Sequence, residues 1–200
     1  MRFFRLPFFA GWLFPQALFR IRTKEKILCL TFDDGPDPDS TPFLLNILDK
    51  HQIKATFFCC GNAAEKYPDL IKLITSKGHL IGNHSYSHLK GWETPFGKYI
   101  EDVNRAAVST SSVLFRPPYG QLTLKQDKTL MKTYKIVFWD LMPYDFDNQL
   151  GSKNSLNILK KKIRPGSVIV LHDSRKSIVN SFLGEFIDFS NSQGYRFVLP

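Results

Sequence analysis

Residues 28–38, which read LCLTFDDGPDP, decide the fold because a strand-like apolar run ends there in two adjacent carboxylates. The run is typical of a strand whose two faces are both covered. Asp33 and Asp34 end it, and a Gly-Pro turn follows. Neighbouring residues at a strand end point in different directions, so the two carboxylates can take two roles, such as metal ligand and base. An ordinary Asp-Asp-Gly surface turn is the alternative.

Strand and helix patterns alternate about seven times on either side of this stretch. We expect strands at 26–32, 54–60, 79–83, 113–116, 135–140, 167–171 and 195–199. We expect helices from about 41, at 62–78, and at about 95–112, 123–133, 154–163 and 178–192. Alternation of this kind predicts an α/β fold with a parallel sheet, either open or closed into a barrel. With 200 residues, the chain is long enough for one domain with a sizeable core.

Titratable side chains interrupt this pattern at the carboxyl ends of the expected strands. They are Asp33 and Asp34 after the first strand, His84 and His88 after the third, Arg116 and Tyr119 after the fourth, Asp145 after the fifth and His172 at the end of the sixth. Barrels and open α/β sheets build their active sites at these ends. Turn residues alone would scatter over both ends, so the distribution indicates a functional site.

A metal site is one interpretation of three of these residues. His84 and His88 are four residues apart, a spacing that can bring two imidazoles to one ion. With Asp34 they make a set of three protein ligands, which leaves positions open for water and substrate. The set suits zinc best, and cobalt, nickel, manganese or iron are also compatible. The alternative is a pair of solvated loop histidines.

Three further residues suggest acid-base chemistry. Asp33 lies beside the candidate ligand Asp34 and can take a proton from water. His172 titrates near neutral pH and can protonate a leaving amine, unless it is a strand-end histidine bonded to a backbone carbonyl. Arg116 can hold a carboxylate ionised, or can be a surface arginine at a Pro-rich turn.

Five ordered motifs resemble those of the polysaccharide deacetylases, also called the NodB-like family or carbohydrate esterase family four. They are TFDDG at 31–35, HSYSH at 84–88, RPPYG at 116–120, DLMPYDF at 140–146 and VLHD at 170–173. The resemblance covers about residues 25–200, and the order and spacing of the motifs make it specific. It implies a single-domain, distorted (β/α) barrel of seven strands, similar to a TIM barrel.

The resemblance also implies a role for each site residue. It implies that Asp33 is the general base, that His172 is the general acid, and that Asp34, His84 and His88 are the metal ligands. Arg116 would orient Asp33, and Asp145 would tune His172. The backbone N–H of Tyr119 would bind the oxyanion, and Leu171 would line the pocket for the acetyl methyl group. Phe146 stands where the family usually has Trp, which keeps an aromatic wall but loses the indole N–H.

Residues 1–24 form a basic, aromatic N-terminal arm ahead of the NodB-like domain at 25–200. The first 26 residues hold six Lys/Arg, one acid and seven aromatic residues, and so carry five of the nine net positive charges. The combination is typical of a segment at a membrane surface. The alternative is an arm packed on the domain. Nucleic acid is not an expected partner, because no binding motif accompanies the charge.

The N-terminus makes a poor signal peptide, because Pro and Gly break its apolar part at 6–19 and no small-residue cleavage site follows. Cys29, Cys59 and Cys60 lie in apolar strand-like runs, so we expect buried free thiols rather than disulfides. Both features favour the cytoplasm or the inner membrane surface. Family resemblance favours the cell envelope, so the compartment stays open.

Together these features predict a metal-dependent hydrolase that removes N-acetyl groups from an N-acetylglucosamine-type polysaccharide or oligosaccharide. One alternative is a deacylase of a lipid-linked sugar or small amide at the membrane face. Another is a non-catalytic carbohydrate-binding relic of the same fold. The intact set of Asp33, Asp34, His84, His88 and His172 argues against the relic, because a binding protein need not retain both acid and base.

Overall fold

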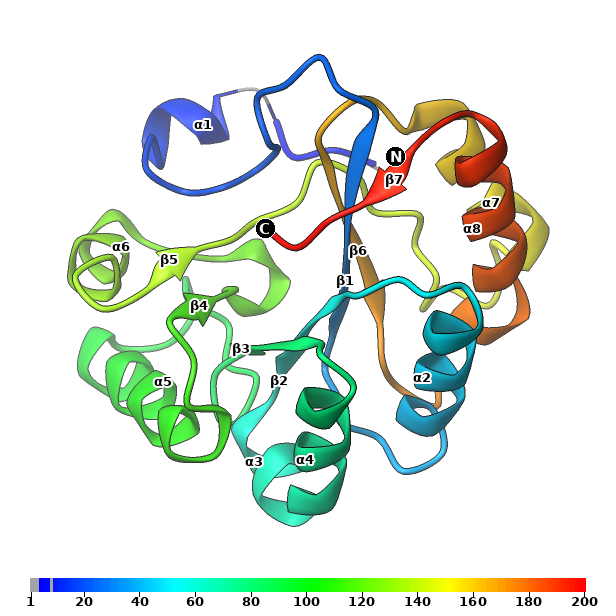
Figure 1. The fold of residues 1–200 in the computed structure, drawn as a ribbon. Helices are drawn as coiled ribbons and strands as arrows, with labels where there is room; N and C mark the ends of the chain where they lie inside the picture. Colours follow the sequence, from blue (N-terminus) through cyan, green and yellow to red (C-terminus); the bar gives the residue numbers. More distant parts are fainter. Residues whose placement is uncertain (1–3, 8) are drawn as a thin grey trace.

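A parallel sheet curls into a half-barrel with helices around its outside, in a computed structural model that describes residues 4–7 and 9–200 (Figure 1). Its strands are β1 (Ile27–Asp33), β2 (Thr56–Cys59), β3 (Leu80–Asn83), β4 (Leu114–Phe115), β5 (Lys135–Ile136), β6 (Ser167–His172) and β7 (Arg196–Phe197). The order is β5-β4-β3-β2-β1-β6, and β7 pairs with the first residues of β1. All these pairings are parallel, which confirms the predicted seven-stranded α/β fold.

Helices follow most of the strands and cover the outer face of the sheet (Figure 1). They are α1 (Ala10–Leu13), α2 (Thr41–Lys50), α3 (Gly61–Lys66), α4 (Pro68–Ser76), α5 (Phe96–Thr110), α6 (Leu124–Leu130), α7 (Ser152–Lys162) and α8 (Leu183–Ser192), with 3-10 turns at Pro118–Gly120 and Val179–Ser181. The single helix expected over 62–78 is wrong. Tyr67 leaves the helical region between α3 and α4, because Pro68 lacks a backbone N–H and restricts the residue before it.

Side chains of β1 alternate between the barrel interior and the helical layer, as strand geometry requires. Leu30 and Phe32 belong to the large core beneath the helices. The interior at the amino end of the strands is filled by a smaller cluster of Cys29, Phe58, Leu114, Val137 and Val168. Asp33 continues the interior row and lies opposite His172 in the β1–β6 register. The side-chain alternation that builds the core therefore also places Asp33 and His172 inside the barrel at the carboxyl ends of their strands.

Isolated bridges, rather than a regular ladder, span the gap between β5 and β6. The N–H of Leu18 donates to the carbonyl of Ile136 at 2.8 Å, and the N–H of Ile21 donates to that of Gly166 at 2.9 Å. Nearer the carboxyl end, Leu141 pairs with Ile169. The strand expected at 135–140 is therefore regular only over β5. Residues 18–21 of the N-terminal arm form part of the barrel wall.

The three cysteines are buried and free, as predicted. Within residues 4–7 and 9–200, no helix combines the length and apolar character needed to cross a membrane.

Candidate active site

A cavity of about 470 Å³ opens at the carboxyl ends of the strands. Seven predicted site residues line it, namely Asp33, Asp34, His84, His88, Tyr119, Phe146 and His172. They come from the ends of β1, β3 and β6 and from the loops that follow β3, β4 and β5. Segments far apart in the sequence thus meet in one cavity, as the carboxyl-end distribution of titratable residues predicts.

Asp34, His84 and His88 bring three ligand atoms within 4.8 Å of one another. Oδ1 of Asp34 is 3.2 Å from Nε2 of His88 and 3.6 Å from Nε2 of His84. Ligand atoms about 2.0–2.1 Å from a tetrahedral zinc ion would lie roughly 3.3 Å apart, so these spacings fit such an ion. Asp34 and His88 have φ values of 80° and 56°. Positive φ values at residues other than glycine are strained, and such residues cluster at functional sites.

The tautomer of His84 also suits a metal ligand. Its Nδ1 is 2.8 Å from the carbonyl oxygen of Arg116, which can only accept, so Nδ1 carries the hydrogen. Nε2 therefore presents its lone pair to the cluster, as in metal sites where an outer partner fixes the ligand ring. Burial lowers the pKa of His84 to about 4, so the imidazole is neutral at physiological pH. The donor set fits one divalent cation.

Arg116 is fully buried and holds Asp33 from inside the barrel. Its Nη1 donates to Oδ1 of Asp33 at 2.7 Å and lies 2.6 Å from Oγ1 of Thr31. Nε and Nη2 donate to the carbonyls of Val137 and Phe138 at 3.1 and 3.0 Å. The guanidinium thus fixes one carboxylate oxygen, while Oδ2 of Asp33 is 3.8 Å from Nε2 of His84. The other oxygen faces the cluster, where a base is needed.

His172 is held by Asp145 through both its ring and its backbone. Nδ1 donates to Oδ1 of Asp145 at 2.9 Å, and the backbone N–H donates to Oδ2 at 2.8 Å. The hydroxyl of Ser177 donates to Oδ2 at 2.6 Å. Burial opposes the imidazolium, but the Asp145 carboxylate outweighs it, and the pKa of His172 rises to about 9. At neutral pH the ring is therefore a cationic acid with Nε2–H free to donate.

The remaining predicted residues are placed as follows. Tyr119 has a φ of 58°, and its ring packs 4.6 Å from that of His88. Phe146 stands edge-on to the His172 ring, with centroids 4.8 Å apart. Leu171 does not line the cavity and is packed in the core under the helices. Strand alternation turns it outward, and Val170 occupies the wall instead.

Five residues of the cavity wall are not among the predicted site residues. They are Trp139, Met142, Val170, Ser174 and Lys176. Met142 and Val170 lie within the quoted motifs, and alternation from His172 could have found Val170. Trp139 ends the apolar run 135–140, where it reads as an ordinary core residue.

Asp173 is a buried carboxyl group that supports the Asp33–Asp34 turn. Its Oδ2 accepts from the hydroxyl of Thr41 at 2.5 Å, and its N–H donates to the carbonyl of Asp33 at 2.8 Å. Burial raises the pKa of Asp173 to about 7. A Cβ on Gly35 would lie 2.3 Å from Oδ2 of Asp173, so this close approach requires glycine in the turn.

Comparison with known proteins gives consistent matches. The family model for polysaccharide deacetylase matches residues 20–136. A peptidoglycan-N-acetylglucosamine deacetylase of Bacillus cereus is 35% identical over 181 residues, which are 86% of this chain and 66% of that relative, just under two thirds of its length. Peptidoglycan-N-acetylmuramic acid deacetylase PdaA of Bacillus subtilis is 32% identical and is aligned over 91% of this chain and 73% of its own.

Solved structures share the fold. The crystal structure of the Bc1960 peptidoglycan N-acetylglucosamine deacetylase superimposes with a TM-score of 0.90 at 30% identity. The match covers 97% of this chain and 94% of that one. The agreement over nearly the whole length supports the distorted single-domain barrel.

Proposed function

Because the chain belongs to the polysaccharide deacetylase family, we propose that it hydrolyses the N-acetyl group of an N-acetylated sugar in a glycan. One observation carries the proposal. A carboxylate held by a buried arginine and a histidine held by a buried carboxylate face one cavity, beside a His-His-Asp cluster. Relatives of the chain are named peptidoglycan-N-acetylglucosamine and peptidoglycan-N-acetylmuramic acid deacetylases.

Asp34, His84 and His88 would hold the divalent ion, and zinc suits their nitrogen and oxygen donors best. When bound, the ion supplies Lewis-acid chemistry to the amide oxygen and the attacking water. The sequence spacing of His84 and His88 and the fixed Nε2 lone pair of His84 support this assignment.

The chain's own groups move the protons. Asp33 accepts a proton from water as the water oxygen attacks the amide carbon, and Arg116 keeps that carboxylate oriented. The backbone N–H of Tyr119 donates to the oxygen that gains negative charge. His172 gives its Nε2 proton to the leaving nitrogen as the C–N bond breaks. The products are acetate and a free amino sugar.

N-acetylglucosamine-type glycan is the substrate class that we propose. The named relatives act on N-acetylglucosamine or N-acetylmuramic acid in peptidoglycan. Trp139, Met142 and Phe146 give the cavity an apolar wall against which a sugar face and a methyl group can pack. Acetate release should be measured with N-acetylglucosamine oligomers and with peptidoglycan. Saturable glycan binding without acetate from either would instead support a non-catalytic carbohydrate-binding protein.

The pH dependence of the reaction should report on Asp145. With a pKa of about 9, His172 is protonated below that pH and loses its acid function as pH rises through it. We expect kcat/KM to fall on the alkaline side accordingly. Asp145→Asn removes the charge that raises this pKa, so the alkaline limb should move to lower pH. An unchanged limb in Asp145→Asn would contradict the proposed acid.

A second candidate substrate is a lipid-linked sugar at a membrane face. The observation that favours it is an exposed apolar group around α1, where Trp12, Leu13 and Phe9 are 78%, 48% and 49% exposed. Exposed Arg22 adds positive charge to the same arm. Apolar and basic groups together favour an anionic lipid surface. The predicted membrane contact of residues 1–24 belongs to this candidate, and residues 1–3 and 8 lie outside the described part.

Liposome co-sedimentation tests the second candidate. A chain that starts at Thr23 is not a suitable comparison for this experiment, because it lacks Leu18 and Ile21, which belong to the barrel wall. We therefore compare the full chain with Trp12→Ser/Leu13→Ser, which changes only exposed side chains. The full chain should sediment with anionic vesicles and the double variant should stay in the supernatant. Equal recovery of both in the supernatant would remove the motivation for a membrane-bound substrate.

A further inference from the structure

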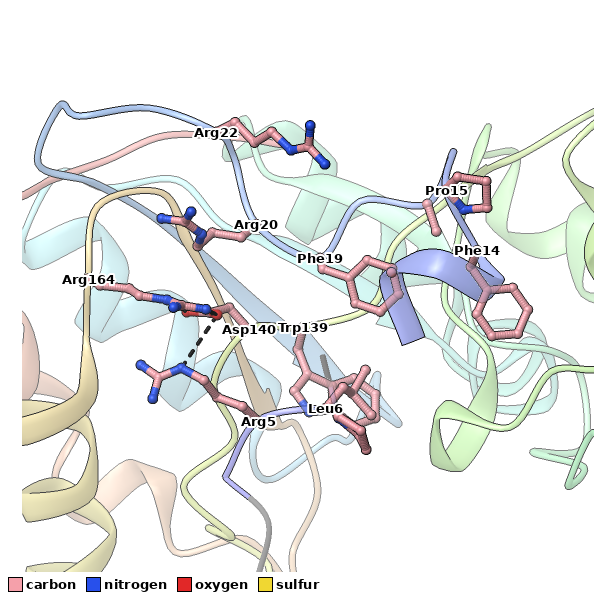
Figure 2. Close-up of a pocket in the computed structure, with 13 residues that line it drawn as sticks. Arg5, Leu6, Phe14, Pro15, Phe19, Arg20, Arg22, Trp139, Asp140 and Arg164 are labelled. Carbon is pink, nitrogen blue, oxygen red and sulfur yellow. Dashed lines mark hydrogen bonds and ion pairs between the residues drawn. The ribbon is translucent and has the colours of Figure 1, made fainter. Parts of the chain in front are cut away.

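A second cavity, of about 250 Å³, lies between the N-terminal arm and the barrel (Figure 2). Arg20 pairs with Ser167, the first residue of β6, and Arg164 precedes that strand by three residues. The cavity therefore lies at the amino end of β6, whereas His172 marks the carboxyl end and the candidate active site. Trp139 lines both cavities and stands between them.

Positive charge dominates this second cavity. Four arginines line it, namely Arg5, Arg20, Arg22 and Arg164, against a single carboxylate, Asp140. Asp140 is buried, and its two oxygens are already engaged by Arg164, by the hydroxyl of Ser167 and by an ion pair with Arg5. Its acceptor capacity is filled by these groups. Three positive charges in the lining remain uncompensated.

Several guanidinium N–H groups have no strong acceptor. Nε of Arg5 is buried, makes no hydrogen bond among the described residues, and is 3.5 Å from Oδ1 of Asp140. Arg20 donates to one neutral acceptor, the carbonyl of Pro165, at 2.9 Å. Arg22 is exposed and has no partner within the part of the chain that the structure describes. Figure 2 shows Arg5, Arg20 and Arg164 gathered around Asp140, with Arg22 above them.

Apolar side chains form another part of the cavity lining. Leu6, Phe14, Phe19 and Trp139 contribute to it, and Figure 2 shows Phe14 and Phe19 on the side away from Arg164, with Trp139 beside its chain neighbour Asp140. Phe19 is fixed there by stacking on Phe138, with ring centroids 4.7 Å apart. A ligand that satisfies both the arginines and the apolar side chains must combine an anionic group with an apolar one.

We propose that this cavity, which we call the arginine cavity, binds a phosphate ester that carries an apolar substituent. Phosphate matches the planar donor forks of arginine, which bind it through paired hydrogen bonds. Arg5, Arg20 and Arg22 supply the donors, and Arg164 keeps Asp140 neutralised. The apolar substituent lies against Phe14, Phe19 and Trp139. The ester can be a lipid headgroup or a small soluble molecule, which share this chemistry.

Isothermal titration calorimetry on the metal-loaded full chain tests the proposal. Three probes are compared, namely inorganic phosphate, phenyl phosphate and dihexanoyl phosphatidate below its micelle concentration. We expect one binding site, with the esters at least about 10-fold tighter than inorganic phosphate because burial of their apolar part adds free energy. Tighter binding of phosphatidate than of phenyl phosphate identifies a lipid headgroup. Equal affinities of these two esters, both above the affinity of inorganic phosphate, identify a small ester. Equal affinity for all three probes would overturn the apolar part of the proposal.

Four variants locate the binding. Arg22→Gln and Arg20→Gln should each weaken ester binding by about 10-fold, since each removes a charged hydrogen-bond donor. Arg22 is exposed, so that variant does not endanger folding. Lys128→Gln removes one exposed charge on α6 and should bind as wild type. His88→Ala should also bind as wild type, which separates the arginine cavity from the metal cluster. Loss of binding in His88→Ala alone would overturn the proposal.

Discussion

Asp33→Asn should lower kcat/KM for acetate release by about 100- to 10,000-fold, the usual contribution of a positioned base. The amide keeps the shape of the carboxylate and can still accept the hydrogen bond from Nη1 of Arg116. It cannot take a proton from water. Because Asp33 is not one of the three clustered ligands, the variant should keep one equivalent of metal.

The control for this prediction is Asp39→Asn, which changes an exposed carboxylate of the same loop. Asp39 pairs with Arg175 at the surface and does not line the cavity. Its variant should keep wild-type activity and metal content. Wild-type kcat/KM in metal-loaded Asp33→Asn would remove Asp33 from the role of base.

Arg116→Leu should lower the free energy of unfolding by about 3–5 kcal/mol, the usual cost of breaking a buried ion pair. The substitution leaves the Asp33 carboxylate buried without its cation. It also removes the donors that now satisfy Thr31 and the carbonyls of Val137 and Phe138. Urea unfolding of the metal-free protein measures the loss without any contribution from the ion.

Two variants show whether the loss comes from the buried pair. Arg196→Leu removes an arginine that pairs with Glu25 at the surface, and should cost less than about 1 kcal/mol. The double variant Asp33→Asn/Arg116→Leu no longer contains the Asp33 carboxylate, which Arg116→Leu alone leaves buried without a cation. That double variant should be more stable than the sum of the two single losses predicts. Additive losses would show that Arg116 stabilises the fold independently of the Asp33 carboxylate, which would contradict the buried-pair explanation.

The candidate site was predictable because its residues stand at strand ends. Asp33 and His172 close apolar runs, and parallel strands bring their carboxyl ends to one edge. His84 and His88 follow β3, and their spacing suggested a shared ion. The prediction that Leu171 lines the pocket is wrong, because alternation from His172 places the Leu171 side chain on the outer face of the sheet.

Features that depend on tertiary packing were not predictable. No pattern in the sequence around residues 18–21 indicates that they complete the barrel wall. Their place there depends on the gap between β5 and β6, which lie far from them in the sequence. Trp139 reads as a core residue, yet it lines two cavities at opposite ends of the barrel. The arginine cavity likewise joins Arg5 and Arg20 to Arg164 across more than 140 positions of sequence. Such contacts follow from the way the curled sheet and the N-terminal arm pack together, rather than from any local pattern.

Metal dependence of acetate release tests the central claim most directly. The protein is stripped with a chelator, reloaded with zinc or cobalt, and assayed on N-acetylglucosamine oligomers, with His84→Ala carried through the same steps. We expect no acetate from the stripped protein, recovery on reloading, and neither metal retention nor recovery in His84→Ala, because Nε2 of His84 belongs to the cluster. Undiminished acetate release by protein shown to be metal-free would contradict the account.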